Sequence, residues 1–345
     1  MKYPSLWFND GDIVLSPNTG YRPELPSFLV HRHVLSTNSP VFAAIFKQPF
    51  AVQRNQIEDI QEIDVLQVKD PAEDLAVLLS CLYYLKLPFR RDQPTVNVDL
   101  GGLLRLCTKY QISDLAAKVV NQLKFEWPTS LSIWAEHETR IRKWGIAHAD
   151  APNGQIDGQY LDNRFPEPVS IIQLAREFNI PELLPAALYT LSLISPSANY
   201  DTFHTLGARL LPEYATQLSR GTRSARWSLL SPQDFLCLAK GQDHLRSNKT
   251  LTRVFEGIAC SPNCSAGCDA LLVALRELVE QTHDILGALT YLRLYITEPE
   301  KASKMNICAN CEKGICNTIE ALRLRIWRNL PWWFGVPEIE FHAIE

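Results

Sequence analysis

The sequence lacks any long apolar run, and this absence excludes the simplest membrane topologies. Nowhere do about 18 uncharged apolar residues follow one another, so we predict no membrane-spanning helix. The N-terminal residues MKYPSLWFNDGD contain no apolar stretch followed by a small-residue cleavage site, and they predict no secretory signal. We therefore expect an intracellular protein of the cytoplasm, the nucleus or both.

A large excess of charge is also missing. The chain carries a formal net charge of −4, which does not favour general attraction to nucleic acid or to an anionic membrane. Hydrophobic residues make up 46% and charged residues 21% of the sequence, a balance that supplies a core and argues against global disorder. The length of 345 residues predicts about two domains.

The motifs of common enzymes do not occur. There is no glycine-rich phosphate loop, no nucleophile elbow and no HExxH helix. Five histidines lack carboxylate partners at useful spacing and are expected to be surface or helix-capping residues: His137, His148, His204, His244 and His283. We predict a protein that is not an enzyme and has no small-molecule substrate.

The first 125 residues alternate short β-branched runs with helical patterns. Two such runs, Ile13–Leu15 and Phe28–Val30, flank a stretch rich in turn-forming residues and predict a β-hairpin. Similar reasoning predicts a helix over residues 31–38, a helix from Pro40, a strand near residues 63–68, a helix capped by Asp70, and a fourth, short strand at Val96 and Val98.

A helical hairpin occurs twice in the sequence. The segment LLRLCTKYQISDLAAKVVNQL begins at Leu103, and IIQLAREFNIPELLPAALYTL begins 68 residues later at Ile171. The alternative is that two unrelated amphipathic hairpins merely look alike. Between them, the polar residues 147–168 lack periodicity and predict a loop or linker, which is the best domain boundary in the sequence. Helical patterns then continue to Pro331.

These patterns predict an α+β protein with four regions. The expected boundaries are a mixed N-terminal domain at 1–125, a helical segment and polar linker at 126–168, a helical region at 169–255 that opens with the repeated hairpin, and a cysteine-rich helical subdomain at 256–345.

The N-terminal region resembles a BTB/POZ domain. The segments DGDIVL and FLVHRHVLSTNSPVFAAIF hold the residues that carry the resemblance, namely Asp12, His31, Arg32, Val34, Leu35, Ser39 and Phe42, and DPAEDLAVLLSCLYYL resembles the third helix of that family. The resemblance implies a protein-interaction module. It marks Asp12, His31, Arg32, Ser39 and Phe42 as the signature and partner surface. In the family's pattern the charged pair, here His31 and Arg32, lies near an acidic residue, here Asp12, and orders a surface pocket.

An LAR…IP…LPAA pattern runs from Leu174 to Ala187, and a Cys-x-x-Cys followed by W…LP…F is formed by Cys308, Cys311, Trp327, Leu330, Pro331 and Phe334. In this layout the whole chain further resembles the large BTB families of mushroom-forming fungi, whose members repeat that hairpin and share that ending. What the family implies is self-association or an adaptor role toward a cullin-type ubiquitin ligase. Ile60-Gln61-Glu62 fits the hydrophobic-x-Glu motif of such adaptors loosely. An extra N-terminal helix, through which many animal members form swapped dimers, is not expected here.

The chain has nine cysteines, and this odd number argues against a simple secreted disulfide framework. Six of them lie in the last quarter of the chain. In a reducing compartment, clustered thiols are more often metal ligands than disulfides. About four of the six would hold a structural zinc ion if Thr282–Asp284 separates two antiparallel helices. Ordinary buried thiols and redox chemistry are the alternatives. The candidates are Cys260, Cys264, Cys268, Cys308, Cys311 and Cys316.

A second function class is a transcriptional regulator whose cysteine-rich C-terminal end contacts DNA. Arg323, Arg325 and Arg328 lie near Trp327 and could form a basic, aromatic patch. The same residues also fit the solvated face of an amphipathic helix, and we favour that interpretation. Nucleic acid and membranes are therefore not expected as partners.

Overall fold

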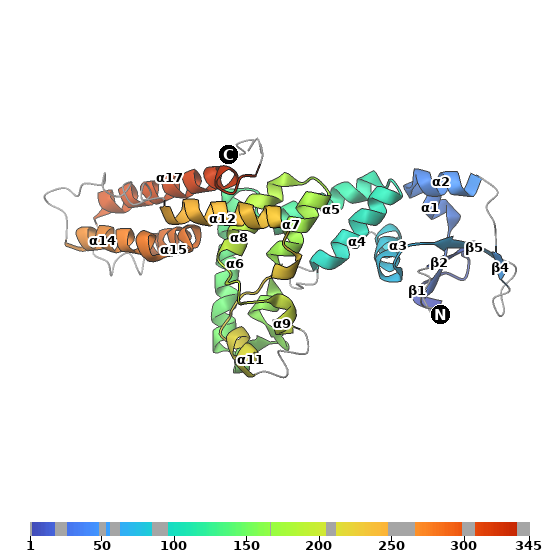
Figure 1. The fold of residues 1–345 in the computed structure, drawn as a ribbon, viewed down its shortest axis with the longest axis horizontal. Helices are drawn as coiled ribbons and strands as arrows, with labels where there is room; N and C mark the ends of the chain where they lie inside the picture. The colour runs from blue at the N-terminus through green and yellow to red at the C-terminus, as the bar shows by residue number, and fades with distance from the viewer. Residues whose placement is uncertain are drawn as a thin grey trace. The chain divides into compact units, whose positions relative to one another are not determined.

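The computed structural model describes residues 2–17, 26–47, 53–55, 63–84, 96–165, 167–204, 212–247, 266–298 and 308–336. By their internal contacts the residues fall into two compact units, Met1–Leu123 and Lys124–Glu345. The N-terminal unit combines a small mixed sheet with helices, and the C-terminal unit is mainly helical (Figure 1). The predicted α+β class is confirmed.

The predicted hairpin lies at the centre of the N-terminal unit. Strands β2 (Ile13–Pro17) and β3 (Ser27–Val30) pair antiparallel, and Val14 lies opposite Leu29. Their β-branched and aromatic residues suit a pleated, buried surface. Ile13 and Phe28 accordingly have no exposed surface.

The sheet has five strands in the order β1-β3-β2-β5-β4. The predicted third strand is β5 (Ile63–Val68), which runs parallel to β2. Two edge strands were not predicted: β1 (Lys2–Trp7), parallel to β3, and β4 (Gln53–Asn55), antiparallel to β5. Both are defined by long-range pairing, which a local pattern does not reveal.

The helices described in this part of the chain are α1 (Arg32–Asn38), α2 (Pro40–Lys47), α3 (Ala72–Tyr84), α4 (Val96–Lys109) and α5 (Ser113–Glu126). The prediction of a strand at Val96 and Val98 was wrong, because both residues belong to α4. Leu100, Leu103 and Cys107 of that helix are buried at helical spacing. Burial of this face outweighs the weak strand preference of two valines.

The repeated hairpin is real at the level of the backbone. Its copies are α4–α5 and α7 (Pro168–Glu177) followed by η3 (Pro181–Leu183) and α8 (Leu184–Ser192). Gln111 and Asn179, which correspond in the alignment, both have left-handed backbones with φ of 55° and 52°. The amides of Ile112 and Ile180 then donate to the carbonyls of Cys107 and Ala175, each at 2.8 Å. Each first helix therefore ends in the same Schellman motif.

The C-terminal unit contains, besides α7, η3 and α8, the elements α6 (Leu131–Asp150), η1 (Pro152–Gly154), β6 (Gln155–Ile156), β7 (Gln159–Tyr160), η2 (Leu161–Arg164), α9 (Tyr200–His204), α11 (Pro212–Ser219), η4 (Trp227–Leu229), α12 (Pro232–Ser247), α14 (Ala266–Gln281), α15 (Ile285–Thr297) and α17 (Ala309–Trp333). Helix α6 contacts both α15 and α17.

The polar stretch at 147–168 is not an open linker. It forms the end of α6, the short β6–β7 hairpin and η2, and Asp162 and Arg164 within it are buried. Asp157 and Gly158, at the tip of the hairpin, have φ of 54° and 71°. The turn residues that indicated a linker therefore form a tight hairpin.

The C-terminal helices double back as predicted. Helix α14 ends at Gln281, and α15 begins after Asp284, whose carboxylate caps it by accepting from the Gly287 amide at 2.9 Å. Helix α17 then contacts α15, and Figure 1 shows α14, α15 and α17 running alongside one another. The arrangement places the start of α17 beside the start of α14.

Candidate functional site

Asp12 and Arg32 tie the start of α1 to the sheet. His31, the residue before α1, makes no side-chain cap, and Asp12 takes over this role by accepting from the Arg32 amide at 2.7 Å. The Arg32 guanidinium forms an ion pair with Asp64 on β5. This charged pair is engaged within the unit, and both of its side chains remain about 30% exposed, at 28% and 32%.

His31 belongs to a neighbouring polar and aromatic cluster. Its amide donates to the Tyr83 hydroxyl at 2.8 Å, and its Nε2 lies 3.3 Å from a carboxylate oxygen of Asp10. The Tyr83 ring stacks on Phe8 with centroids 4.5 Å apart. Burial raises the pKa of Tyr83, and the charges of Asp12 and Asp10 add to this effect against the lowering by the His31 hydrogen bond. The hydroxyl is therefore neutral at physiological pH.

Ser39 and Phe42 are interior residues, so their assignment to a partner surface was wrong. Both have no exposed surface. The Ser39 hydroxyl donates to the Tyr110 carbonyl at 2.6 Å and accepts from the Phe42 amide at 3.1 Å. The Phe42 ring stacks on Tyr110 with centroids 4.2 Å apart. These two residues join the α1–α2 corner to the end of α4.

Asp70 extends the same interior cluster. It is 4% exposed and accepts from the Tyr110 hydroxyl at 2.5 Å and from Lys109 Nζ at 2.6 Å. Burial raises the pKa of Tyr110, and the hydrogen bond and charge of Asp70 raise it further. Tyr110 is therefore a neutral donor to an anchored carboxylate, which is a structural arrangement.

Three of the six candidate cysteines converge in the C-terminal unit. The sulfur atoms of Cys268, Cys308 and Cys311 all lie within 4.8 Å of one another. Cys268 lies in the first turn of α14, Cys308 caps α17, and Cys311 lies in the first turn of α17. Cys268 and Cys311 are buried and Cys308 is half-buried.

The other three candidates do not join this group within the described residues. Cys316 lies farther along α17, and burial together with the charge of Glu312 raises its pKa despite the opposing charge of Arg293. Cys260 and Cys264 lie outside the described residues. In the N-terminal unit, burial raises the pKa of Cys81 to about 11 and that of Cys107 to about 12. Those two are protonated core thiols.

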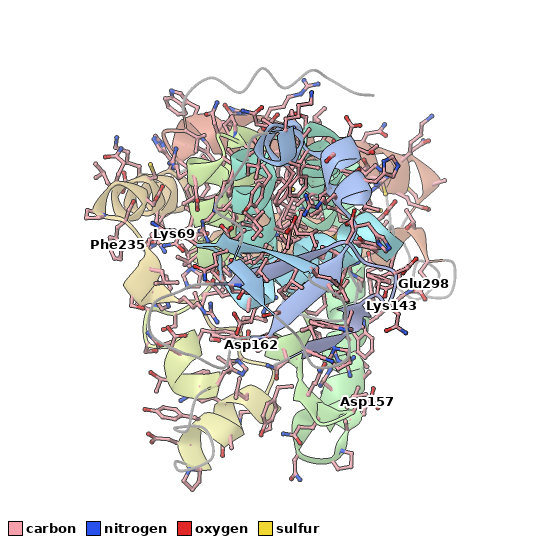
Figure 2. The ribbon with its side chains drawn as sticks, turned by 90° about the vertical axis from the view of Figure 1, so that its right-hand side faces the viewer. Lys69, Lys143, Asp157, Asp162, Phe235 and Glu298 are labelled. Carbon is pink, nitrogen blue, oxygen red and sulfur yellow. The ribbon has the colours of Figure 1, made fainter. Side chains whose placement is uncertain are left out.

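A buried carboxylate network in the C-terminal unit was missed by the sequence analysis. Asp162, 2% exposed, accepts from the His204 ring at 2.8 Å, from Arg223 Nε at 3.2 Å and from the Ser224 amide at 3.0 Å. Burial would raise the pKa of Asp162, but these donors together hold it below the usual value. Figure 2 marks Asp162 and the exposed Asp157 of the nearby hairpin.

Two of the histidine predictions were consequently wrong. His204 does have a carboxylate partner, Asp162, from which it is separated by 42 residues. His148 is 2% exposed, and its Nδ1 lies 2.9 Å from the Gly154 carbonyl. Sequence spacing could not reveal the contact of His204, because it forms only when α9 folds against η2.

The C-terminal basic patch is smaller than the sequence indicated. Arg323 is 1% exposed and donates to Glu320 at 2.6 Å, and Trp327 is 4% exposed. Arg325 and Arg328 remain exposed. The patch therefore reduces to the two arginines on the outer face of α17, while Trp333 is buried and Trp332 is 68% exposed.

Comparison with known families concerns the N-terminal part of the chain. Residues 25–126 match the family model of the BTB/POZ domain. This part of the chain is a BTB/POZ domain. Its sheet extends upstream of the match, because β2 supplies the central pairing partner of both β3 and β5.

No curated protein matches the chain. The resemblance to the BTB families of mushroom-forming fungi stays a prediction. Among the described residues, no helix is long and apolar enough to span a membrane. BTB domains mediate association between proteins, so the chain carries a protein-interaction module.

Proposed function

We propose that this chain is a non-enzymatic adaptor or assembly factor that binds a protein partner through its BTB domain. The match of residues 25–126 to that domain is the observation that carries the proposal. The charges of Asp12, Arg32 and Asp64 support the non-enzymatic part of the proposal, because their contacts hold α1 against the sheet. A cullin-type ubiquitin ligase scaffold is the first partner to test, and a second copy of the chain is the other.

The cullin motif proposed from the sequence, Ile60-Gln61-Glu62, lies outside the described residues. The surface beside His31, which includes the exposed Asp10, offers an alternative point of contact for a protein partner. Asp10 has a side chain that is 86% exposed and contacts the His31 ring at 3.3 Å, and because the carboxylate lies at the surface, its replacement should leave the fold intact. This makes Asp10 suitable for probing the surface.

Affinity purification of the full chain from its own cells tests the proposal, with light scattering after gel filtration to measure self-association. We expect recovery of a cullin scaffold or a dimer, and loss of that partner with Asp10→Lys. Glu213→Lys is the matched control, since it makes the same charge change at an exposed position in the C-terminal unit. A monomeric chain that recovers no scaffold would refute the adaptor and assembly roles.

DNA binding remains the second candidate. The two exposed arginines on α17, Arg325 and Arg328, would make few phosphate contacts. Each contact releases counterions and steepens the salt dependence of binding. Duplex binding by the full chain that weakens steeply with salt, and that is lost with Arg325→Ala and Arg328→Ala, would favour this function over the adaptor role.

A further inference from the structure

We propose that Cys268, Cys308 and Cys311 bind one structural zinc ion that joins the first turn of α14 to the N-terminus of α17. This inference is independent of the partner bound by the BTB domain. It rests on the convergence of three thiols from two helices in the C-terminal unit. Cys268 is 40 or more residues away from the other two along the chain.

The distances fit a single tetrahedral ion. A zinc–sulfur bond is about 2.3 Å long, so two thiolates on one tetrahedral zinc are about 3.8 Å apart. The three sulfurs already lie within 4.8 Å of one another, and a small movement of the side chains suffices. Thiolate ligands select zinc, copper(I) or iron–sulfur clusters. In an iron–sulfur cluster at least two of three thiolates would bind different irons and would lie farther apart, which favours a single ion.

The backbone around the three sulfurs suits bound thiolates. The amide of Cys308 donates to the sulfur of Cys268, and the amide of Cys311 donates to the sulfur of Cys308, each at 3.4 Å. Three thiolates on a divalent cation leave one excess negative charge. The positive end of the α17 dipole lies at this point and favours that charge.

The Cys-x-x-Cys spacing explains how one helix supplies two ligands. Cys308 is the N-cap residue of α17, with an extended backbone, and Cys311 is three residues later in the first turn. Residues at these two positions of a helix N-terminus lie on the same side, as the amide–sulfur contact between them shows. Cys316, five residues farther along, is outside the group and provides an internal comparison.

The metal content of the full chain tests this proposal. The protein is produced in cells supplied with zinc, purified with a phosphine reductant and without chelator, and analysed by plasma mass spectrometry. We expect about one zinc per chain, falling to about a tenth of that with Cys308→Ser or Cys311→Ser. Cys316→Ser should keep its zinc.

Cobalt provides a readout that does not depend on the variants folding. Wild-type chain loaded with cobalt(II) should show strong sulfur-to-cobalt charge-transfer absorption together with the visible bands of a tetrahedral ion. Wild-type protein with far less than one metal per chain would overturn the proposal, as would a Cys316→Ser variant that loses as much zinc as Cys311→Ser. Thiols that resist alkylation until a disulfide is reduced would overturn it as well.

Discussion

Ser39 shows how one buried hydroxyl connects two elements of the BTB domain. It donates to the carbonyl that ends α4 and accepts from an amide in the first turn of α2, with no exposed surface. A side chain of this kind resembles a surface residue in sequence. Its value lies in the two backbone groups that would otherwise be buried without a partner.

Replacing Ser39 with alanine should therefore destabilise the domain. We expect Ser39→Ala to lower the local free energy of unfolding by about 1–3 kcal/mol, because a buried carbonyl and a buried amide lose their partner. Hydrogen exchange of peptides from residues 26–47 in the full chain measures this. Thr37→Ala, at an exposed position of α1, should change it by about 0.5 kcal/mol or less. Equal effects of the two variants would contradict the role of Ser39.

The buried network of Asp162 leads to a prediction about how stability depends on pH. Because its folded pKa lies below the unfolded value, ionised Asp162 stabilises the C-terminal unit above about pH 4 and loses this effect as the pH falls through the folded pKa. We expect Asp162→Asn to cost about 3–5 kcal/mol at pH 7, as in other broken buried pairs.

Urea unfolding followed by tryptophan fluorescence measures this change, since Trp7 is the only tryptophan before residue 124. The difference between wild type and Asp162→Asn should shrink from pH 7 to pH 3. Asp157→Asn in the nearby hairpin, where the carboxylate is 84% exposed, should have an effect of about 1 kcal/mol or less. A difference that stays constant with pH would rule out the ionised network.

At the scale of elements, the repeated hairpin allows one comparison to be made twice. Gln111 and Asn179 occupy the same left-handed position of two equivalent Schellman motifs. A left-handed backbone costs about 1–2 kcal/mol for an ordinary L-residue, whereas asparagine tolerates it better and glycine best.

Glycine should therefore stabilise the first hairpin more than the second. We expect Gln111→Gly to raise the local free energy of unfolding by about 0.5–1 kcal/mol and Asn179→Gly to raise it less. Ala117→Gly, at an exposed position within α5, should lower it by about 1 kcal/mol. Hydrogen exchange of the three variants gives the signs. Destabilisation by Gln111→Gly would show that its side chain makes a contact worth more than the backbone strain.

The elements also show which parts of the structure could be predicted from sequence. Local signals were sufficient for the β2–β3 hairpin, for the existence of helix α3 and for the reversal at Asp284 between α14 and α15. The predicted cap of α3 by Asp70 stays a prediction, and the Asp70 carboxylate accepts from Lys109 and Tyr110. Local signals failed for β1, which exists only through its pairing with β3, and for α4, where packing outweighs strand preference.

The candidate sites, too, were predictable only where a local sequence signal marks them. Cysteine spacing indicated a convergence and the structure brings Cys268, Cys308 and Cys311 together, but which three would meet depended on the packing of three helices. Family resemblance identified Ser39 without showing that it is buried. No local signal could identify Asp162, because its partners lie 42 to 62 residues away along the chain.

At the scale of the whole molecule, the residues fall into two compact units. The BTB domain has its own sheet and its own polar interior around Asp70, whereas the cysteine cluster belongs to the C-terminal unit. A perturbation that acts on the cysteines alone should therefore affect one unit. Chains with two such units do not unfold as one two-state system, and the two transitions can be followed separately.

Removal of zinc should destabilise the C-terminal unit selectively. A ligand at a thousand times its Kd stabilises the folded state by about 4 kcal/mol, and we expect chelation to remove at least about that much from the unit. The transition followed by tryptophan fluorescence should move to lower temperature, while hydrogen exchange of peptides from residues 2–84 should stay unchanged. Cys316→Ser should respond to chelator as the wild type does, and Cys311→Ser should not respond. A shift of both units together, or of neither, would contradict a zinc ion that stabilises the C-terminal helices.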